Sequence, residues 1–222
     1  MEFQAAGVFG SITNNITVEA NTIFRGPRAG IVYNDLYGGN HVTRLNIMFD
    51  LVMVTHDHGP YNVWDRQQWM LPQGFTSIKN VVESNVIIGN WNGPKNVDLD
   101  DGARDHIVRH NLLYRGHIKF KGSDHEAYEN FIVAVEGSQN SCLVIVESHK
   151  VFPSYAFYRN KCFAYPAKRF LLYSWENIGG MHFKAPLWMS FRSPNRSEPG
   201  LGGFVEIRPL RFILEGMATT RW

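Results

Sequence analysis

The chain has few cysteines, no concentration of charge of one sign and no long apolar run. Its 222 residues contain two cysteines, Cys142 and Cys162, which excludes a small disulfide scaffold and a multi-cysteine zinc module. The net charge is +2, and the 22 Lys and Arg residues form no basic tract of the kind that binds nucleic acid. No apolar stretch approaches the ~18 residues needed to cross a bilayer. We therefore expect neither a nucleic-acid partner nor a membrane span.

The chain is rich in small polar residues, with 20 Gly and 18 Asn, and many of the asparagines are ordered along it. The repeated template is a short segment of alternating polar and apolar residues that ends in Asn. Two apolar residues come directly after the Asn. It recurs with spacings of 25, 39, 26, 19, 30 and 17 residues at Asn21, Asn46, Asn85, Asn111, Asn130, Asn160 and Asn177. The last three copies are the weaker ones.

This spacing favours a β-solenoid over other repeat folds. Helical repeats need roughly 33 to 47 residues, whereas a coil of short strands fits near 20 and tolerates insertions. The segments alternate with the period of a strand. In a parallel β-helix, coils stack about 4.8 Å apart, so an inward Asn at one corner would bond the Asn above and below it. A β-propeller or β-sandwich is the alternative, but neither explains aligned Asn positions without regular hairpin turns.

A second set of positions supports the same coil. The dipeptides Gly26-Pro27, Gly59-Pro60 and Gly93-Pro94 each precede a short alternating segment. With these repeats, residues 8–183 resemble the right-handed parallel β-helix proteins of the pectate-lyase-like superfamily. Residues 57–67 and 92–102 further resemble uncharacterised, secreted β-helix proteins.

We predict an all-β fold, a right-handed parallel β-helix of about seven coils over residues 1–183. Residues 184–222 have no ladder Asn and are rich in proline, so we expect an irregular cap or extension there. The coil ends could pair with other chains.

A candidate groove follows from strand alternation. If residues 97, 99, 118 and 120 point inward, Asp98 and Asp100 point outward beside Lys119 and Lys121 of the next coil, with Trp64 and Arg66 on the preceding coil. Charged groups beside an aromatic ring suit an extended acidic polysaccharide. The competing interpretation is that the Asp and Lys rows only compensate each other's charge on a sheet surface.

The resemblance implies roles for these residues. In pectate-lyase-like enzymes a calcium ion neutralises the substrate carboxylate while a basic residue removes the proton alpha to it. By resemblance in role, the catalytic candidates are Lys119, Lys121, Arg66 and His117, and the calcium candidates are Asp98, Asp100 and Asp101. A lysine acts as such a base only if its pKa is lowered. Aspartates at strand ends are also ordinary turn formers, which is the alternative to a calcium site.

The longest insertion of the repeat adds the substrate-binding candidates His58, Trp64 and Asp65. The glycosidase motifs of pectin-cutting β-helices are matched only in part, by residues 96–98, 100–101 and 116–118, so hydrolysis ranks below elimination.

The sequence thus predicts a carbohydrate-active protein that binds or cleaves an acidic polysaccharide, by β-elimination if it is an enzyme. The alternative is a non-catalytic structural or adhesive β-helix of an extracellular assembly. We expect an extracellular or cell-surface location. Because the chain carries no signal peptide, we also expect it to be a fragment or a processed form.

Overall fold

The computed structural model describes ten segments of the chain. They are residues 6–35, 38–66, 78–88, 91, 93–134, 141–147, 155–164, 171–175, 205–206 and 210–212. These residues form strands, turns and bends, and none of them lies in a helix. Accordingly, this part of the chain offers no helix that could cross a membrane.

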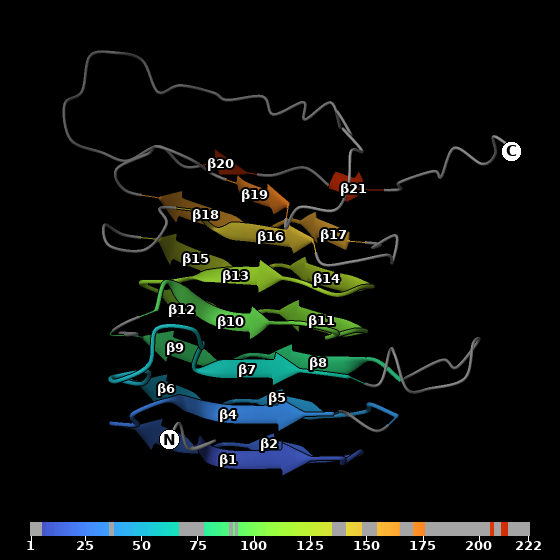
Figure 1. Cartoon of the computed structure of the whole chain (residues 1–222). Helices are drawn as coiled ribbons and strands as arrows, with labels where there is room; N and C mark the ends of the chain where they lie inside the picture. The colour runs from blue at the N-terminus through green and yellow to red at the C-terminus, as the bar shows by residue number, and fades with distance from the viewer. Residues whose placement is uncertain are drawn as a thin grey trace, which may run out of the picture.

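The strands stack into three sheets that the chain visits in turn (Figure 1). Sheet A is parallel throughout, and its neighbouring strands are three apart in chain order. Its strands are β1 (Ala6–Ser11), β4 (Ala29–Asn34), β7 (Tyr61–Trp64), β10 (Lys95–Leu99), β13 (His117–Phe120), β16 (Leu143–Glu147) and β19 (Leu171–Trp175).

Sheets B and C follow the same order. Sheet B contains β2 (Thr17–Glu19), β5 (Val42–Arg44), β8 (Asn80–Glu83), β11 (His106–Arg109), β14 (His125–Tyr128), β17 (Tyr155–Tyr158) and β21 (Leu210–Phe212). Sheet C contains β3 (Thr22–Phe24), β6 (Ile47–Phe49), β9 (Val86–Ile88), β12 (Leu112–Tyr114), β15 (Phe131–Ala134), β18 (Lys161–Ala164) and β20 (Val205–Glu206). Only β20 and β21 run antiparallel to their neighbours, β18 and β17.

This order confirms an all-β parallel solenoid. A sandwich or propeller would pair consecutive strands through hairpins, whereas here each strand pairs with the one a full coil away. The predicted Gly-Pro positions also hold, since Gly26-Pro27, Gly59-Pro60 and Gly93-Pro94 each precede a strand of sheet A. Most of residues 184–222, where a cap was expected, lie outside the described segments.

The core lies between the three sheets and is filled by alternate side chains of each strand. In sheet A these include Val97, Leu99, Ile118 and Phe120, all fully buried, as the sequence predicted. A disulfide joins Cys142 before β16 to Cys162 in β18, and both side chains are buried.

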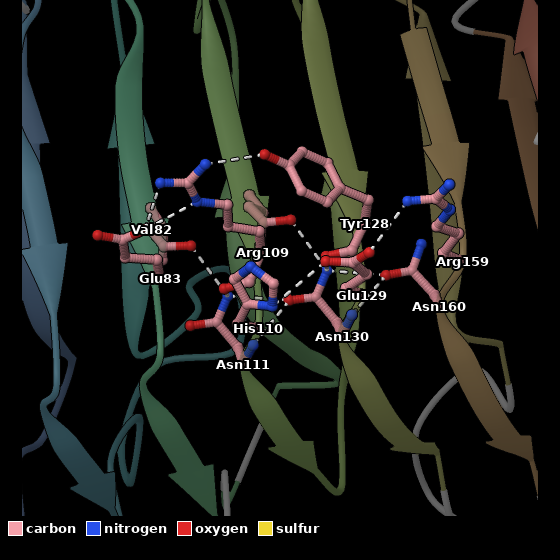
Figure 2. Close-up of polar contacts among 11 residues, drawn as sticks. Val82, Glu83, Arg109, His110, Asn111, Tyr128, Glu129, Asn130, Arg159 and Asn160 are labelled. Atoms are coloured by element: carbon pink, nitrogen blue, oxygen red, sulfur yellow. Dashed lines mark hydrogen bonds and ion pairs between the residues drawn. The ribbon is translucent and has the colours of Figure 1, made fainter.

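The predicted Asn column forms at the corner between sheets B and C; Figure 2 shows its C-terminal part. Each Asn donates a side-chain hydrogen bond to the Oδ1 atom of the next, at 2.8 to 3.1 Å. The same Oδ1 atoms accept the backbone N–H of the preceding Asn at 2.9 to 3.0 Å. The column, here called the Asn ladder, consists of Asn21, Asn46, Asn85, Asn111, Asn130 and Asn160, while Asn177 lies outside the described residues.

The residue before each ladder Asn has left-handed backbone geometry. These residues have φ between +54° and +58° and none is glycine: Ala20, Leu45, Ser84, His110, Glu129 and Arg159. Such geometry costs a non-glycine residue about 1 kcal/mol or more. The ladder's hydrogen bonds hold the corner in this conformation, because they pair both the backbone and the side chain of each Asn.

Candidate functional site

The predicted contact between an aspartate row and a lysine row is present on the outer face of sheet A. Asp98 of β10 pairs in register with Lys119 of β13, and their Oδ1 and Nζ atoms lie 3.0 Å apart. The same ammonium group lies 2.6 Å from Oδ1 of Asp100. Strand alternation explains this geometry, because Val97 and Leu99 on either side of Asp98 point into the core.

Two further lysines extend this contact into a network. The Nζ atom of Lys95 lies 3.1 Å from Asp98 and 3.1 Å from Asp57. The Nζ atom of Lys121 lies 2.8 Å from Asp101 and 3.9 Å from Asp100. We call this network the charge cluster; its members are Asp57, Lys95, Asp98, Asp100, Asp101, Lys119 and Lys121.

The cluster is buried at its centre and open at its margin. The Asp98 side chain is fully buried and that of Lys119 is 8% exposed, whereas Asp101 and Asp57 are 39% and 79% exposed. Burial raises the pKa of Asp98 despite the attraction of Lys119 and Lys95. For Asp100, that attraction outweighs burial and lowers the pKa. Solvent therefore reaches the cluster past the carboxylates of Asp57 and Asp101.

Lys119 is held in its protonated form. Burial alone would lower its pKa, but the adjacent Asp98 and Asp100 outweigh burial and raise the pKa above the ordinary lysine value. The base mechanism implied by the resemblance requires a lowered pKa instead. The geometry therefore suits Lys119 to holding an anionic group and disfavours it as the group that removes a proton.

Two histidines flank the cluster in neutral form. His117, on β13 two residues before Lys119, is fully buried, and neither ring nitrogen has a hydrogen-bond partner within the described part of the chain. Burial, with the nearby charges of Lys95 and Lys119, lowers its pKa to about 3. His58 accepts a hydrogen bond from Nε of Arg28 at 3.2 Å, and burial together with Arg28 lowers its pKa to about 4.

Other predicted site residues do not join the cluster. Arg66 forms a salt bridge with Asp35 of an earlier coil, whose Oδ1 accepts from both the backbone N–H and Nε of Arg66. Its guanidinium also lies 4.9 Å from the centroid of the Trp64 ring, so it covers one face of that aromatic. Asp65 is buried, with 1% of its surface exposed. Of the predicted binding residues, His58 and Trp64 are half-buried beside the cluster, and Trp64 ends β7, the strand that pairs with β10.

The sequence interpretation missed Lys95 and Arg28, and it considered Asp57 only together with His56 and His58, as a possible metal or acid/base cluster. Lys95 follows Gly93-Pro94 directly, so the Gly-Pro positions could have placed it on sheet A. A β-bulge between Lys95 and Val97 shifts the register, so Lys95 points to the same side as Asp98. Simple alternation would have placed Lys95 inward.

The carboxylates proposed as calcium ligands each face a lysine. Asp98, Asp100 and Asp101 all have an ammonium group within 3.1 Å. The described residues contain no group of three His, Cys, Asp or Glu side chains that could hold a metal ion. A cation at this position would have to displace at least one ammonium group.

The cluster is not something that sheet A requires. Its row on the outer face continues in register through Val32, Asn62, Asp98, Lys119 and Val144, and all five are buried. Neutral residues fill this row in the other coils. Burying ionised groups costs several kcal/mol each before pairing compensates. Local burial of charge where the fold accepts valine is typical of a functional site.

Comparison with known proteins adds no assignment: no family model, curated protein or solved structure matches this chain.

Proposed function

We propose that this protein is an extracellular β-helix that binds an acidic polysaccharide along the outer face of sheet A, at the charge cluster. The observation that carries the proposal is a group of charged side chains in a face that neutral residues fill elsewhere: Asp98, Lys119 and Lys121 are buried, and Lys95 and Asp100 are half-buried. Three ammonium groups, on β10, on β13 and directly after β13, suit the repeated carboxylates of a uronate chain. The half-buried ring of Trp64 offers apolar contact beside them.

If the protein is an enzyme, β-elimination is the reaction that fits these residues. Lys119 would hold the substrate carboxylate, since it keeps its proton. In the elimination a base takes the proton alpha to that carboxylate, the bond to the glycosidic oxygen breaks and that oxygen gains a proton; full burial and a pKa of about 3 make His117 poorly suited to be that base. Arg66 is less suited to a catalytic role because Asp35 already binds it. Ca²⁺ remains a proposed addition, to be tested by chelation.

The finer architecture belongs to the same proposal. Crossovers between parallel strands are right-handed in nearly all proteins, so we propose a right-handed β-helix of about seven coils over residues 1–183. The buried disulfide between Cys142 and Cys162 supports an extracellular location, because such bonds persist in oxidising compartments.

The test is a panel of pectate, alginate and glycosaminoglycans, with Ca²⁺ or with chelator, assayed for binding and for the ultraviolet absorbance of unsaturated uronate. Lys121→Met keeps the aliphatic stem and removes the charge. Because one of the three ammonium groups of the cluster is removed, we expect this variant to bind the acidic polymer more weakly and, in an enzyme, to turn it over more slowly. Arg159→Met, at an exposed arginine that directly follows β17, is the matched control and should change neither binding nor rate.

The second candidate is a non-catalytic structural or adhesive β-helix. It is favoured by the pairing within the cluster, where every lysine already faces an aspartate. In that case no polymer is bound or cleaved, and Lys121→Met shifts only stability. That outcome would remove the polysaccharide proposal.

A further inference from the structure

The outer face of sheet C is a regular apolar surface. Its outward side chains form two columns that run along the solenoid, one residue per strand in each column, set by the parallel register. Six of them are large apolar or aromatic side chains that remain 38% to 52% exposed: Phe24, Ile47, Ile88, Leu112, Tyr114 and Phe131. In the six parallel strands described here, one outward position is charged, Lys161 at the C-terminal end of the face. An apolar patch of this kind marks an interaction surface.

The aromatic rings favour a protein partner over a sugar. Phe24 and Phe49 stack with their centroids 5.0 Å apart and their planes 5° apart. One face of each of these two rings therefore lies against the other ring and is not available for stacking. A pyranose ring needs a free aromatic face on which to stack, whereas apolar side chains of another protein pack against edges as well as faces.

Row spacing and charge fit a second copy of the same face. Successive rows are about 4.8 Å apart, a spacing common to all sheets, so a second copy can match the face row for row. Turned end for end about a two-fold axis along the strands, the copy places Lys161 opposite Thr22. Without that reversal, both Lys161 side chains lie in the same end row, each opposite the partner's Phe163, which brings the two positive charges closer together.

The reversed arrangement also matches side-chain sizes. By the register of the strands, Leu112 faces the partner's Val86, Tyr114 faces the partner's Ile88 and Phe131 faces the partner's Ile47. In each pair a larger side chain lies opposite a smaller one, as close packing between two ridged surfaces requires.

We propose that the protein forms an antiparallel two-fold dimer through the outer faces of sheet C. The face is narrow, six strands by about three residues, or roughly 24 Å by 10 Å. This is below the ~800 Å² per partner of a standard interface, so we expect weak, concentration-dependent association. The proposal does not depend on polysaccharide binding, which uses sheet A.

The test is sedimentation velocity from low to high micromolar concentration. We expect the natural sequence to shift from monomer to dimer across this range and Leu112→Lys to stay monomeric. The matched control is Ile107→Lys, at an outward position of sheet B, which should dimerise as the natural sequence does. Because Leu112 is 39% exposed, the variant should keep its circular dichroism spectrum and melting temperature.

A mixing experiment tests the orientation. In the reversed dimer Leu112 lies opposite Val86, so Leu112→Lys mixed with Val86→Glu should restore dimers that neither variant forms alone. A natural sequence that stays monomeric throughout, or a Leu112→Lys variant that still dimerises, overturns the interface. Rescue of Leu112→Lys by Tyr114→Glu instead of Val86→Glu overturns the reversed arrangement, because Leu112 meets Tyr114 only when the two copies run in the same direction.

Discussion

Two of the regions in which this solenoid buries polar side chains differ in how often the arrangement repeats. The Asn ladder places one asparagine at the same corner in six successive coils, exposed in the first coil and buried in the other five. Figure 2 shows Asn111, Asn130 and Asn160. The charge cluster occurs once, where the loop before β7 meets β10 and β13. Repetition indicates a requirement of the fold, because each coil faces the same problem at its corner. The single occurrence of the cluster indicates a role outside the fold.

The two regions also differ in what their partners supply. In the ladder, neutral amides satisfy donors and acceptors on neighbouring coils, so no charge is desolvated. In the cluster, opposite charges must offset a desolvation cost that neutral groups never incur. Four amino-acid replacements test this difference between the ladder and the cluster. They are given from the largest expected effect on stability to the smallest.

Removing one carboxylate from the cluster should have the largest effect. Asp98→Ala leaves the buried ammonium group of Lys119 with one partner fewer, and we expect the free energy of unfolding to fall by about 3–5 kcal/mol. Chemical denaturation measures it. Adding Lys119→Met to Asp98→Ala should recover part of the loss, because the ammonium group that lost a partner is then absent. Lys95, the other lysine beside Asp98, still pairs with Asp57. A double variant no more stable than the single one would contradict a coupled pair.

Breaking the ladder in its middle should cost somewhat less. Asn111→Ala removes the donor to the carbonyl oxygen of Val82 and the acceptor of the Asn85 backbone N–H. With about 1–3 kcal/mol for each buried group left unpaired, we expect a loss of about 3 kcal/mol in unfolding free energy. Thr17→Ala, at an exposed position of β2, is the control and should stay within about 0.5 kcal/mol. Equal losses would mean that the ladder contributes nothing specific.

The buried histidines should make stability depend on pH. His125 points into the core, and burial lowers its pKa to about 4, whereas the unfolded chain protonates near 6.5. The unfolded state therefore binds more protons below that value. Stability is fully present above pH of about 6.5 and falls by up to about 1.4 kcal/mol per unit, for this histidine, down to about pH 4.

The replacement that tests this is His125→Asn. Asparagine stands at the same inward column in β8, where Asn80 pairs in register with His106. We expect unfolding measured between about pH 7 and 4 to show a smaller slope in the variant, by up to one proton. An unchanged slope would show that His125 does not titrate on unfolding.

The exposed ion pair between Arg159 and Glu129, at the corner between sheets B and C, should matter least. Arg159 donates to Glu129 at 3.3 Å, but 70% of the arginine side chain is exposed. Arg159→Ala should change the free energy of unfolding by less than about 1 kcal/mol, and added salt should remove the difference. A larger loss of unfolding free energy that salt does not remove would show that this pair contributes to stability as the buried pairs of the cluster do.

Much of the fold could be predicted from the sequence because its signals are periodic. The spacing of the asparagines gave the coil, the Gly-Pro dipeptides gave the starts of the sheet A strands, and alternation placed Asp98 beside Lys119. The site was predicted only in part. Arg66 binds Asp35, and Lys95 points outward at a bulge, and neither follows from the local pattern.

The sequence by itself therefore determined which residues repeat, which face each strand turns inward and which asparagines stack. Only the tertiary structure decided which charges meet and in which protonation state they are held. The physical reason is that ladder partners are 19 to 39 residues apart along the chain, through connections of unequal length. Contacts across coils depend on how each connection returns the chain. The neighbouring carboxylates that raise the pKa of Lys119 and the burial that raises the pKa of Asp98 exist only once the coils are stacked.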